Sequence, residues 1–460
     1  MKKFLLTLLA ALPMWANAET DYTKGVFIVN EDWYGHQNST VNYLMPDDPD
    51  GNYWEYRVIQ KENPGIELGC TCQFGAIWHD RFYFISKQDK DPGASVAGGR
   101  ITVADAKTMK VLFQSSLIDP SGAQCDGRGF LGITPHKAYI SSSNGVWVFN
   151  LDTFEVSAMI PGTDNPNAGT DSPNTDPSGS LYFGQSGTMV MSAGKVFLAH
   201  QQAGIIVIDP TDDSVAATID MDVVAQGAGV GSLVVAKDGS VWASVAKNTS
   251  GTGATLPYLL RIDPASLSTE VVNLESGIFP PSNSWYAWTP DTFCASTLEN
   301  VLYWSGGSNS WFTGKYVFKF DVDTRTAAKI IDLEADGENW KIYGCSMRVH
   351  PATDELYVSL YREFSIPTYI TRRYDRNGAL LRDYSMISNY WFPSIPVFPG
   401  DAANSALDSV TTAPDHLEGD LYNLSGLLVR PAVAYGAWSG LAPGVYIWHS
   451  ASATRKILIR

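Results

Sequence analysis

The chain has 460 residues, with 48 acidic side chains against 32 Lys and Arg, and a formal net charge of −16 at pH 7. An acidic surface argues against binding to nucleic acid or to an anionic membrane. Aromatic residues make up 12% of the chain, which is more than a disordered chain carries, so we expect a folded protein with a large core.

The first 18 residues read as a secretory signal peptide. Two lysines precede the apolar run at residues 4–12, and residues 16–18 form a small-x-small cleavage site. The run is too short to span a bilayer as a mature helix, and no later run is long and apolar enough to cross a membrane. The sequence therefore predicts an exported mature chain with no membrane-spanning segment.

Residues 22–400 repeat one pattern of strands. Residues 195–220 and 240–274 each contain an apolar strand, a loop, a strand that ends in Ile-Asp-Pro, a tight turn and a third strand. A period of about 50 residues built only of strands is typical of a β-propeller. We therefore predict an all-β, seven-bladed β-propeller over residues 22–400, because alternation and turn residues divide this range into seven sets of strands.

Blade one begins with strands expected at residues 26–30, 40–44 and 54–59. We expect its fourth strand at residues 394–398, since a strand from the far end closes the ring and removes open sheet edges. The other six blades are expected at residues 74–114, 130–160, 188–220, 232–274, 293–333 and 346–386.

An aspartate recurs in the turn between the third and fourth strands of successive blades. An Asp side chain can accept a hydrogen bond from the backbone two residues on, which closes such a turn, so we assign these residues a structural role. They are Asp105, Asp152, Asp209, Asp263, Asp323 and Asp375.

The composition changes after residue 400. Residues 401–417 are rich in Ala, Ser, Thr, Asp and Pro and read as a linker. Residues 418–460 are few for an independent core and contain three strand candidates, at 420–423, 445–448 and 456–459, so we expect a small β module or a processing signal.

The five cysteines of the chain read mostly as small buried residues. Export would permit one disulfide among Cys70, Cys72 and Cys125, whose geometry the sequence does not fix.

One face of a propeller carries both the loops between second and third strands and the connections between blades, and we name it the loop face. Six Trp fall in its loops, accompanied by amide, hydroxyl and other aromatic groups that suit a large neutral ligand. Exposed aromatic clusters usually mark an interaction surface, although the same residues could pack on one another to cap the blades. The predicted ligand contacts are Trp33, Tyr34, His36, Asn38, Lys87, Gln88, Trp285, Trp288 and Trp311.

Catalytic patterns are poor in this sequence. No Gly-x-Ser-x-Gly elbow is present, and no pocket for a quinone cofactor is recognisable. A metal-dependent lactonase would need Glu, Asn and Asp ligands around one ion, for which Glu31 and Asp32 are candidates, with His36 and His200 the best placed histidines. We expect that the protein is not an enzyme and that it has no catalytic residue, metal or cofactor. A lactonase-like propeller and a glycan- or protein-binding adhesin remain alternatives.

Three motifs resemble a known family. They are NEDWYGHQNST at residues 30–40, ELGCTCQFG at 67–75 and SKQDKDPG at 86–93, and they resemble exported YncE-like propellers of Bacteroidetes. Some members of that family bind cobamides (vitamin B12) at the cell surface and form lids on a TonB-dependent corrinoid transporter. The resemblance implies that the loop face binds a corrinoid, and that the partner is a TonB-dependent outer-membrane transporter.

The sequence departs from those members in two ways. They look like lipoproteins, whereas this chain has no acceptor Cys at its cleavage site. Its tail, with LYNLSG from residue 421, LAPGVYIW from 441 and KILI from 456, resembles the C-terminal sorting modules of type IX secretion. This resemblance implies a protein at the cell surface or secreted, associated with the outer membrane.

Overall fold

The computed structural model describes most of the chain between residues 20 and 459. The described ranges are 20–166, 168, 184–220, 230–245, 258–281, 290–307, 313–363, 366–388, 392–399, 418–423, 427–434, 441–442, 444–449 and 454–459. The predicted signal peptide at residues 1–18 and the predicted linker at residues 401–417 lie outside them.

The described part is built almost entirely of antiparallel sheets, and seven of them lie between residues 26 and 397. The first sheet has the strand order β29 (Pro393–Val397), β1 (Val26–Asn30), β2 (Thr40–Leu44) and β3 (Trp54–Glu55). The second has β4 (Cys70–Trp78), β5 (Arg81–Gln88), β6 (Ile101–Asp105) and β7 (Val111–Ser115). The third has β8 (Gly127–Thr134), β9 (Lys137–Ser142), β10 (Gly145–Asn150) and β11 (Val156–Met159).

The remaining sheets follow the same plan. The fourth has β12 (Ser186–Ser192), β13 (Lys195–His200), β14 (Gly204–Asp209) and β15 (Ser214–Ile219). The fifth has β16 (Val230–Val235), β17 (Val241–Val245), β18 (Tyr258–Ile262) and β19 (Thr269–Asn273). The sixth has β20 (Cys294–Ala295), β21 (Val301–Gly306), β23 (Tyr316–Asp321) and β24 (Thr326–Asp332). The seventh has β22 (Thr313–Gly314), β25 (Lys341–Val349), β26 (Leu356–Glu363), β27 (Ile366–Tyr374) and β28 (Leu380–Ser385).

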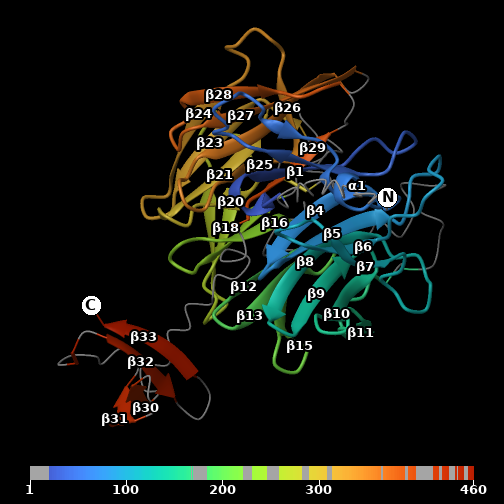
Figure 1. Cartoon of the computed structure of the whole chain (residues 1–460). Helices are drawn as coiled ribbons and strands as arrows, with labels where there is room; N and C mark the ends of the chain where they lie inside the picture. The colour runs from blue at the N-terminus through green and yellow to red at the C-terminus, as the bar shows by residue number, and fades with distance from the viewer. Residues whose placement is uncertain are drawn as a thin grey trace, which may run out of the picture.

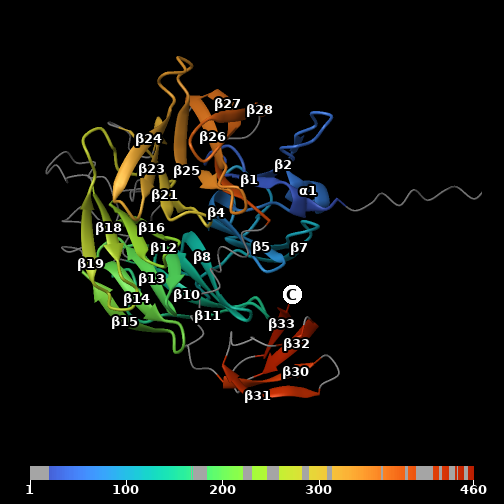
Figure 2. The same cartoon turned by 90° about the vertical axis from the view of Figure 1, so that its left-hand side faces the viewer.

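The sheets are arranged around a common axis (Figures 1 and 2). Their inner strands contact one another in a closed cycle, in the order β29, β4, β8, β12, β16, β20, β25 and back to β29. The predicted β-propeller is therefore confirmed. The expected strand near residues 394–398 is also present, and β29 pairs with β1, with Phe27 opposite Val397.

The third strand of blade one is shorter than predicted. We expected a strand over residues 54–59, but β3 ends at Glu55, and the helix α1 (Val58–Glu62) follows after Arg57, whose φ is 55°. Val58 and Ile59 are apolar because they form the buried side of this helical turn. The sequence pattern alone does not distinguish two such residues from the end of a strand.

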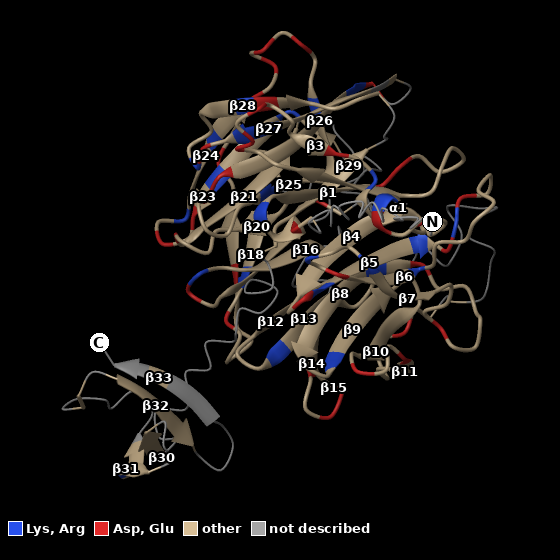
Figure 3. Ribbon diagram, viewed as in Figure 1, with Lys and Arg blue, Asp and Glu red and all other residues tan. Residues whose placement is uncertain are grey.

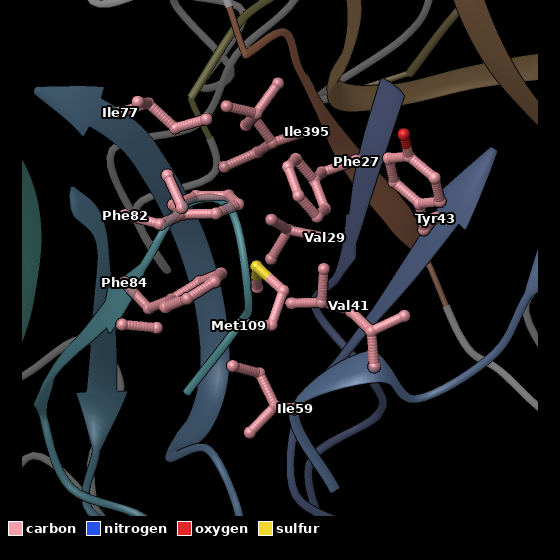
Figure 4. Packing of buried hydrophobic residues seen from close by; sticks show 14 of the residues in the cluster. Phe27, Val29, Val41, Tyr43, Ile59, Ile77, Phe82, Phe84, Met109 and Ile395 are labelled. Carbon is pink, nitrogen blue, oxygen red and sulfur yellow. The ribbon is translucent and has the colours of Figure 1, made fainter. Parts of the chain in front are cut away.

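Strand β1 shows how the blades are held together. All five of its residues are buried, because both faces of its sheet are covered. Phe27 and Val29 pack toward Phe82 of the second blade, whereas Val26 and Ile28 pack with Tyr357 of the seventh. Figure 4 shows the first of these interfaces, where fully burying each large apolar side chain contributes about 1.5–3 kcal/mol.

Asp105, Asp209, Asp263 and Asp375 close their turns as predicted. The Asp105 carboxylate, for example, accepts a hydrogen bond of 2.7 Å from the Thr108 N–H. The other three accept from backbone N–H groups in the same way.

The prediction for Asp152 and Asp323 is wrong by two residues. In these blades Asn150 and Asp321, the last residues of β10 and β23, accept the backbone hydrogen bonds of the turn. The side chain of Asp152 instead contacts His136, and that of Asp323 accepts from Asn300. The recurring acceptor therefore belongs to the end of the third strand and not to a fixed sequence spacing.

The C-terminal part contains a separate sheet with the order β31 (Leu428–Ala434), β30 (Glu418–Asn423), β32 (Gly444–His449) and β33 (Thr454–Ile459). The three predicted strands are present, and β31 is an addition. It contains Pro431, which its position at the edge of the sheet tolerates. Leu421, Val433, Trp448 and Ile457 form a small core of this sheet.

Within the described residues, no helix has the length and apolar character needed to cross a bilayer.

Candidate functional site

Asp91 fastens the loop that carries four of the nine predicted contacts to a loop of the next blade. Its side chain is fully buried. One carboxylate oxygen accepts a hydrogen bond of 2.6 Å from the Gly35 N–H, and the other accepts one of 2.8 Å from the Gly93 N–H. The loop of blade one (residues 31–39) is thereby held against the loop of blade two (residues 89–100).

Asn38 belongs to the same fastening. Its side-chain oxygen accepts from the Asp91 N–H at 2.7 Å, and its amide donates to the Val96 carbonyl at 3.0 Å. The side chain is only 5% exposed. Asn38, a predicted ligand contact, therefore positions the loop through bonds to the backbone.

Asp32 stabilises the blade-one loop from within. It is buried, and its φ of 56° places it in the left-handed region. Its carboxylate accepts hydrogen bonds from Gln37 (2.5 Å) and from the Thr40 hydroxyl (2.9 Å). Because both oxygens are used inside the loop, Asp32 acts as a structural acceptor, and the strained backbone persists because these bonds support it.

Aromatic side chains lie on this fastened loop. The rings of Trp33 and His36 stack with centroids 4.4 Å apart, and Trp33 also meets Phe392 edge to face at 6.3 Å. His36 is exposed, and Tyr34 is 45% exposed. On its inner side, Trp33 packs on a buried cluster made of Tyr343, Tyr361, Tyr369, Met386 and Phe392. The loop therefore both caps the blades and presents aromatic surface, which combines the two alternatives derived from the sequence.

Lys87 is buried close to Glu31, at the end of β5. Burial lowers the pKa of the Lys87 ammonium to about 8, and the neighbouring Glu31 opposes this shift. Burial likewise raises the pKa of Glu31, against the favourable charge of Lys87. The two groups thus partly neutralise one another below the surface.

A second buried pair lies in the next blade. The Arg128 guanidinium donates twice to the Gln185 side-chain oxygen, at 2.8 and 2.6 Å, and lies 3.6 Å from the Asp126 carboxylate. Gln88, the remaining described contact residue, accepts from the Thr71 hydroxyl at 3.3 Å and is half-buried. The predicted contacts Trp285, Trp288 and Trp311 lie outside the described residues.

The axis of the propeller contains a cavity of about 540 Å³. Its walls come from the inner strands β4, β8, β12, β16, β20 and β25, together with Phe398. Gln73, Arg128, Ser232 and Arg348 are among its polar lining residues, and none of them appeared among the predicted contacts. The available sequence signal was a polar residue inside an otherwise apolar inner strand, as at Gln73 and Arg348.

The described residues contain no group of three or more His, Cys, Asp and Glu side chains that could hold a metal ion. His200 is buried, and its Nδ1 accepts from two backbone N–H groups. Burial lowers the pKa of His200 to about 4.

All five cysteines are buried and free, which confirms the prediction that they are small buried residues. Burial raises the pKa of each thiol to about 11 or 12.

Comparison with known proteins places the propeller in a family. The family described as a domain of unknown function (DUF5074) matches residues 24–399, so the chain belongs to it. No protein with a curated record matches the sequence.

Two solved structures are similar to this chain, and the first supports the fold. One is a quinonprotein alcohol dehydrogenase-like protein from Bacteroides thetaiotaomicron VPI-5482, with 17% identity, a TM-score of 0.58, and coverage of 83% of this chain and 79% of that one. Another is the extracellular domain assigned to a hybrid two component system of B. thetaiotaomicron, with 10% identity, a TM-score of 0.47, and coverage of 79% and 45%. At 17% identity, the likeness to the first structure concerns the fold alone.

Proposed function

We propose that this member of the DUF5074 family is a non-catalytic, exported propeller that binds a large ligand rich in amide or hydroxyl groups on its loop face. The observation that carries the proposal is the aromatic surface of Trp33, Tyr34 and His36, held in place by the buried Asp91. A preformed surface loses little conformational entropy on binding, which favours affinity.

The ligand class that fits this surface best is a corrinoid. A flat ring edged with amides can lie against stacked aromatic side chains, while its amides find hydrogen-bonding groups at the rim. The exposed Tyr34 and the half-buried Gln88 supply a hydroxyl and an amide on this face. The resemblance to YncE-like cobamide-binding propellers supports the same ligand.

The cellular setting follows from the same resemblance. The predicted signal peptide and the tail sheet, whose sequence resembles type IX sorting modules, support delivery to the cell surface. There the protein would capture its ligand and deliver it to a TonB-dependent outer-membrane transporter.

The test is a titration of the purified mature chain with cyanocobalamin, followed by tryptophan fluorescence and by calorimetry. We expect saturable one-to-one binding, weakened in a Trp33→Ala, Tyr34→Ala double variant. Tyr53→Ala is the matched control, because Tyr53 lies in the β2–β3 turn, away from the loop face. Wild-type protein that does not bind cyanocobalamin at micromolar concentration would refute the corrinoid proposal, and a glycan array would then test the adhesin alternative.

A further inference from the structure

The cavity on the propeller axis has a charge opposite to that of the whole protein. The chain carries a formal net charge of −16, and Figure 3 shows Asp and Glu in many of the turns and loops around the sheets. Among the described residues that line the cavity, however, three are cationic, Arg128, Lys237 and Arg348, and one is acidic, Asp291. The cavity is therefore a basic compartment inside an acidic protein.

Arg348 is the cation whose charge stays open to the cavity. Its Nη1 donates to the carbonyls of Cys345 (3.4 Å) and Met347 (2.8 Å). No carboxylate of the described residues lies within ion-pair distance of its guanidinium. Arg128, by contrast, is paired with Asp126, and Lys237 is exposed to solvent, where it donates to the Leu298 carbonyl.

The one acidic residue of the lining, Asp291, interacts with the charge of Arg348 but has other hydrogen-bond partners. The Asp291 carboxylate is almost fully buried, and it already accepts from the Ser244 hydroxyl at 2.6 Å and from the Phe293 N–H at 3.0 Å. Burial raises the pKa of Asp291, whereas its hydrogen bonds and the charge of Arg348 lower it.

A polar side chain with no close hydrogen bond to the described residues lies in the same cavity. Gln73 is 4% exposed and lines the cavity; neither of its amide atoms has a partner at normal hydrogen-bond distance among the described residues, and its side chain lies near the Glu31 carboxylate, whose pKa burial raises and Gln73 lowers. Leaving a buried polar group unpaired is costly, so such a group usually has a role. Gln73 lies near Arg348, because the Cys345 thiol is 3.8 Å from the Gln73 carbonyl and the Cys345 carbonyl accepts from Arg348.

The rest of the wall is mainly apolar. Phe130, Met189 and Leu233 come from the inner strands β8, β12 and β16, Phe293 directly precedes β20, and all four line the cavity together with the polar residues. A volume of about 540 Å³ lies within the range of sites for small organic ligands, roughly 300–1,000 Å³. The cavity thus offers one cation and one amide next to an apolar wall.

We propose that the axial cavity binds an amphipathic carboxylate, with the carboxylate held by Arg348 and Gln73 and the apolar body packed against Phe130, Met189 and Phe293. A guanidinium matches a carboxylate with two parallel hydrogen bonds, and the Gln73 amide can donate a third. This site is distinct from the aromatic surface on the loop face and does not depend on the function proposed there.

The probe pair is decanoate and decan-1-ol, which share an apolar chain and differ in charge. We expect calorimetry to show saturable one-to-one binding of decanoate and binding of decanol weaker by about tenfold or more. In Arg348→Met this preference should disappear, with decanol affinity unchanged. Gln73→Leu should weaken decanoate binding, and Arg382→Met, on the outer strand β28, should have no effect.

Three results would each overturn the proposal. The wild-type protein does not bind decanoate, it binds the two probes equally, or Arg348→Met keeps the preference for decanoate. Should Arg348→Met fail to fold, Arg348→Lys keeps the charge but loses the planar donor pair, so it should keep only part of the preference. Cyanocobalamin titration of the same variants separates the two sites, since changes in the cavity should leave binding on the loop face unchanged.

Discussion

Replacement of Asp91 by Asn tests the structural basis of the candidate loop-face site. The substitution keeps the size of the side chain, but one of its two oxygens becomes an amide group. Only one of the N–H groups of Gly35 and Gly93 can then keep its acceptor, and the other faces a second donor. The loop of residues 31–39 would lose one of its fastenings to blade two.

The expected magnitude follows from these contacts. A hydrogen bond to a charged group contributes about 1.5–3 kcal/mol, and a buried N–H left without a partner costs about 1–3 kcal/mol. Relief from burying a carboxylate offsets part of this loss, because Asp91 is fully buried. We expect Asp91→Asn to destabilise the protein by about 1–3 kcal/mol.

Two measurements check this expectation. Urea unfolding reports the global stability, and hydrogen exchange of peptides that cover residues 31–40 reports local opening of the loop. Asp80→Asn is the control, because the Asp80 side chain is 84% exposed and its loss should change stability by less than about 0.5 kcal/mol. If Asp91→Asn matched this control in both measurements, Asp91 would not be the fastening of the loop.

Three further outcomes are expected. Gly132→Ala should destabilise by about 1–3 kcal/mol in urea unfolding, because a Cβ there would overlap the ring of Trp78; unchanged stability would contradict this packing. The pKa of His200 is lowered to about 4 in the folded protein. As the pH falls below about 6.5, His200 therefore becomes protonated in the unfolded chain while it is still neutral in the folded protein. The free energy of unfolding of the wild type should therefore fall by up to about 3 kcal/mol between pH 6.5 and 4, and that of His200→Asn should fall by less. If stability depended on pH in the same way in both proteins, His200 would not be a neutral buried imidazole. The native protein should react little with a thiol reagent at pH 8 and show five thiols after denaturation, whereas rapid labelling of the native form would mean that the thiols are not buried.

Much of the fold was predictable because a propeller blade repeats short-range patterns. Alternating apolar residues located the strands of blades two to seven, and the need to close the ring identified the strand from the far end. The failures occurred where two conformations share a pattern. Val58 and Ile59 are buried in a helical turn as they would be in a strand, and Asn150 replaces Asp152 as turn acceptor because the strand ends at Asn150.

The candidate site was less predictable than the fold. The motif at residues 30–40 indicated the right loop, but the role of each residue depends on distant partners. Asn38 and Asp91 contact one another across two blades, which no local pattern reveals. The exposed Tyr34 and the buried Asp32 are near neighbours in the same motif, and only the folded structure separates surface from support. The axial cavity likewise requires the ring to bring Gln73 and Arg348 close to one another.

The pairing of β29 with β1 has a consequence for the synthesis of the chain. The inner strand of blade one is the last strand of the propeller to be synthesised, so Phe27 cannot pair with Val397 until the chain is almost complete. Contacts of such long sequence separation slow folding, so closure of the ring is expected to be a late step. A product cut short before β29 would leave the hydrogen-bonding edge of β1 unpaired, and incomplete chains should therefore aggregate or be degraded.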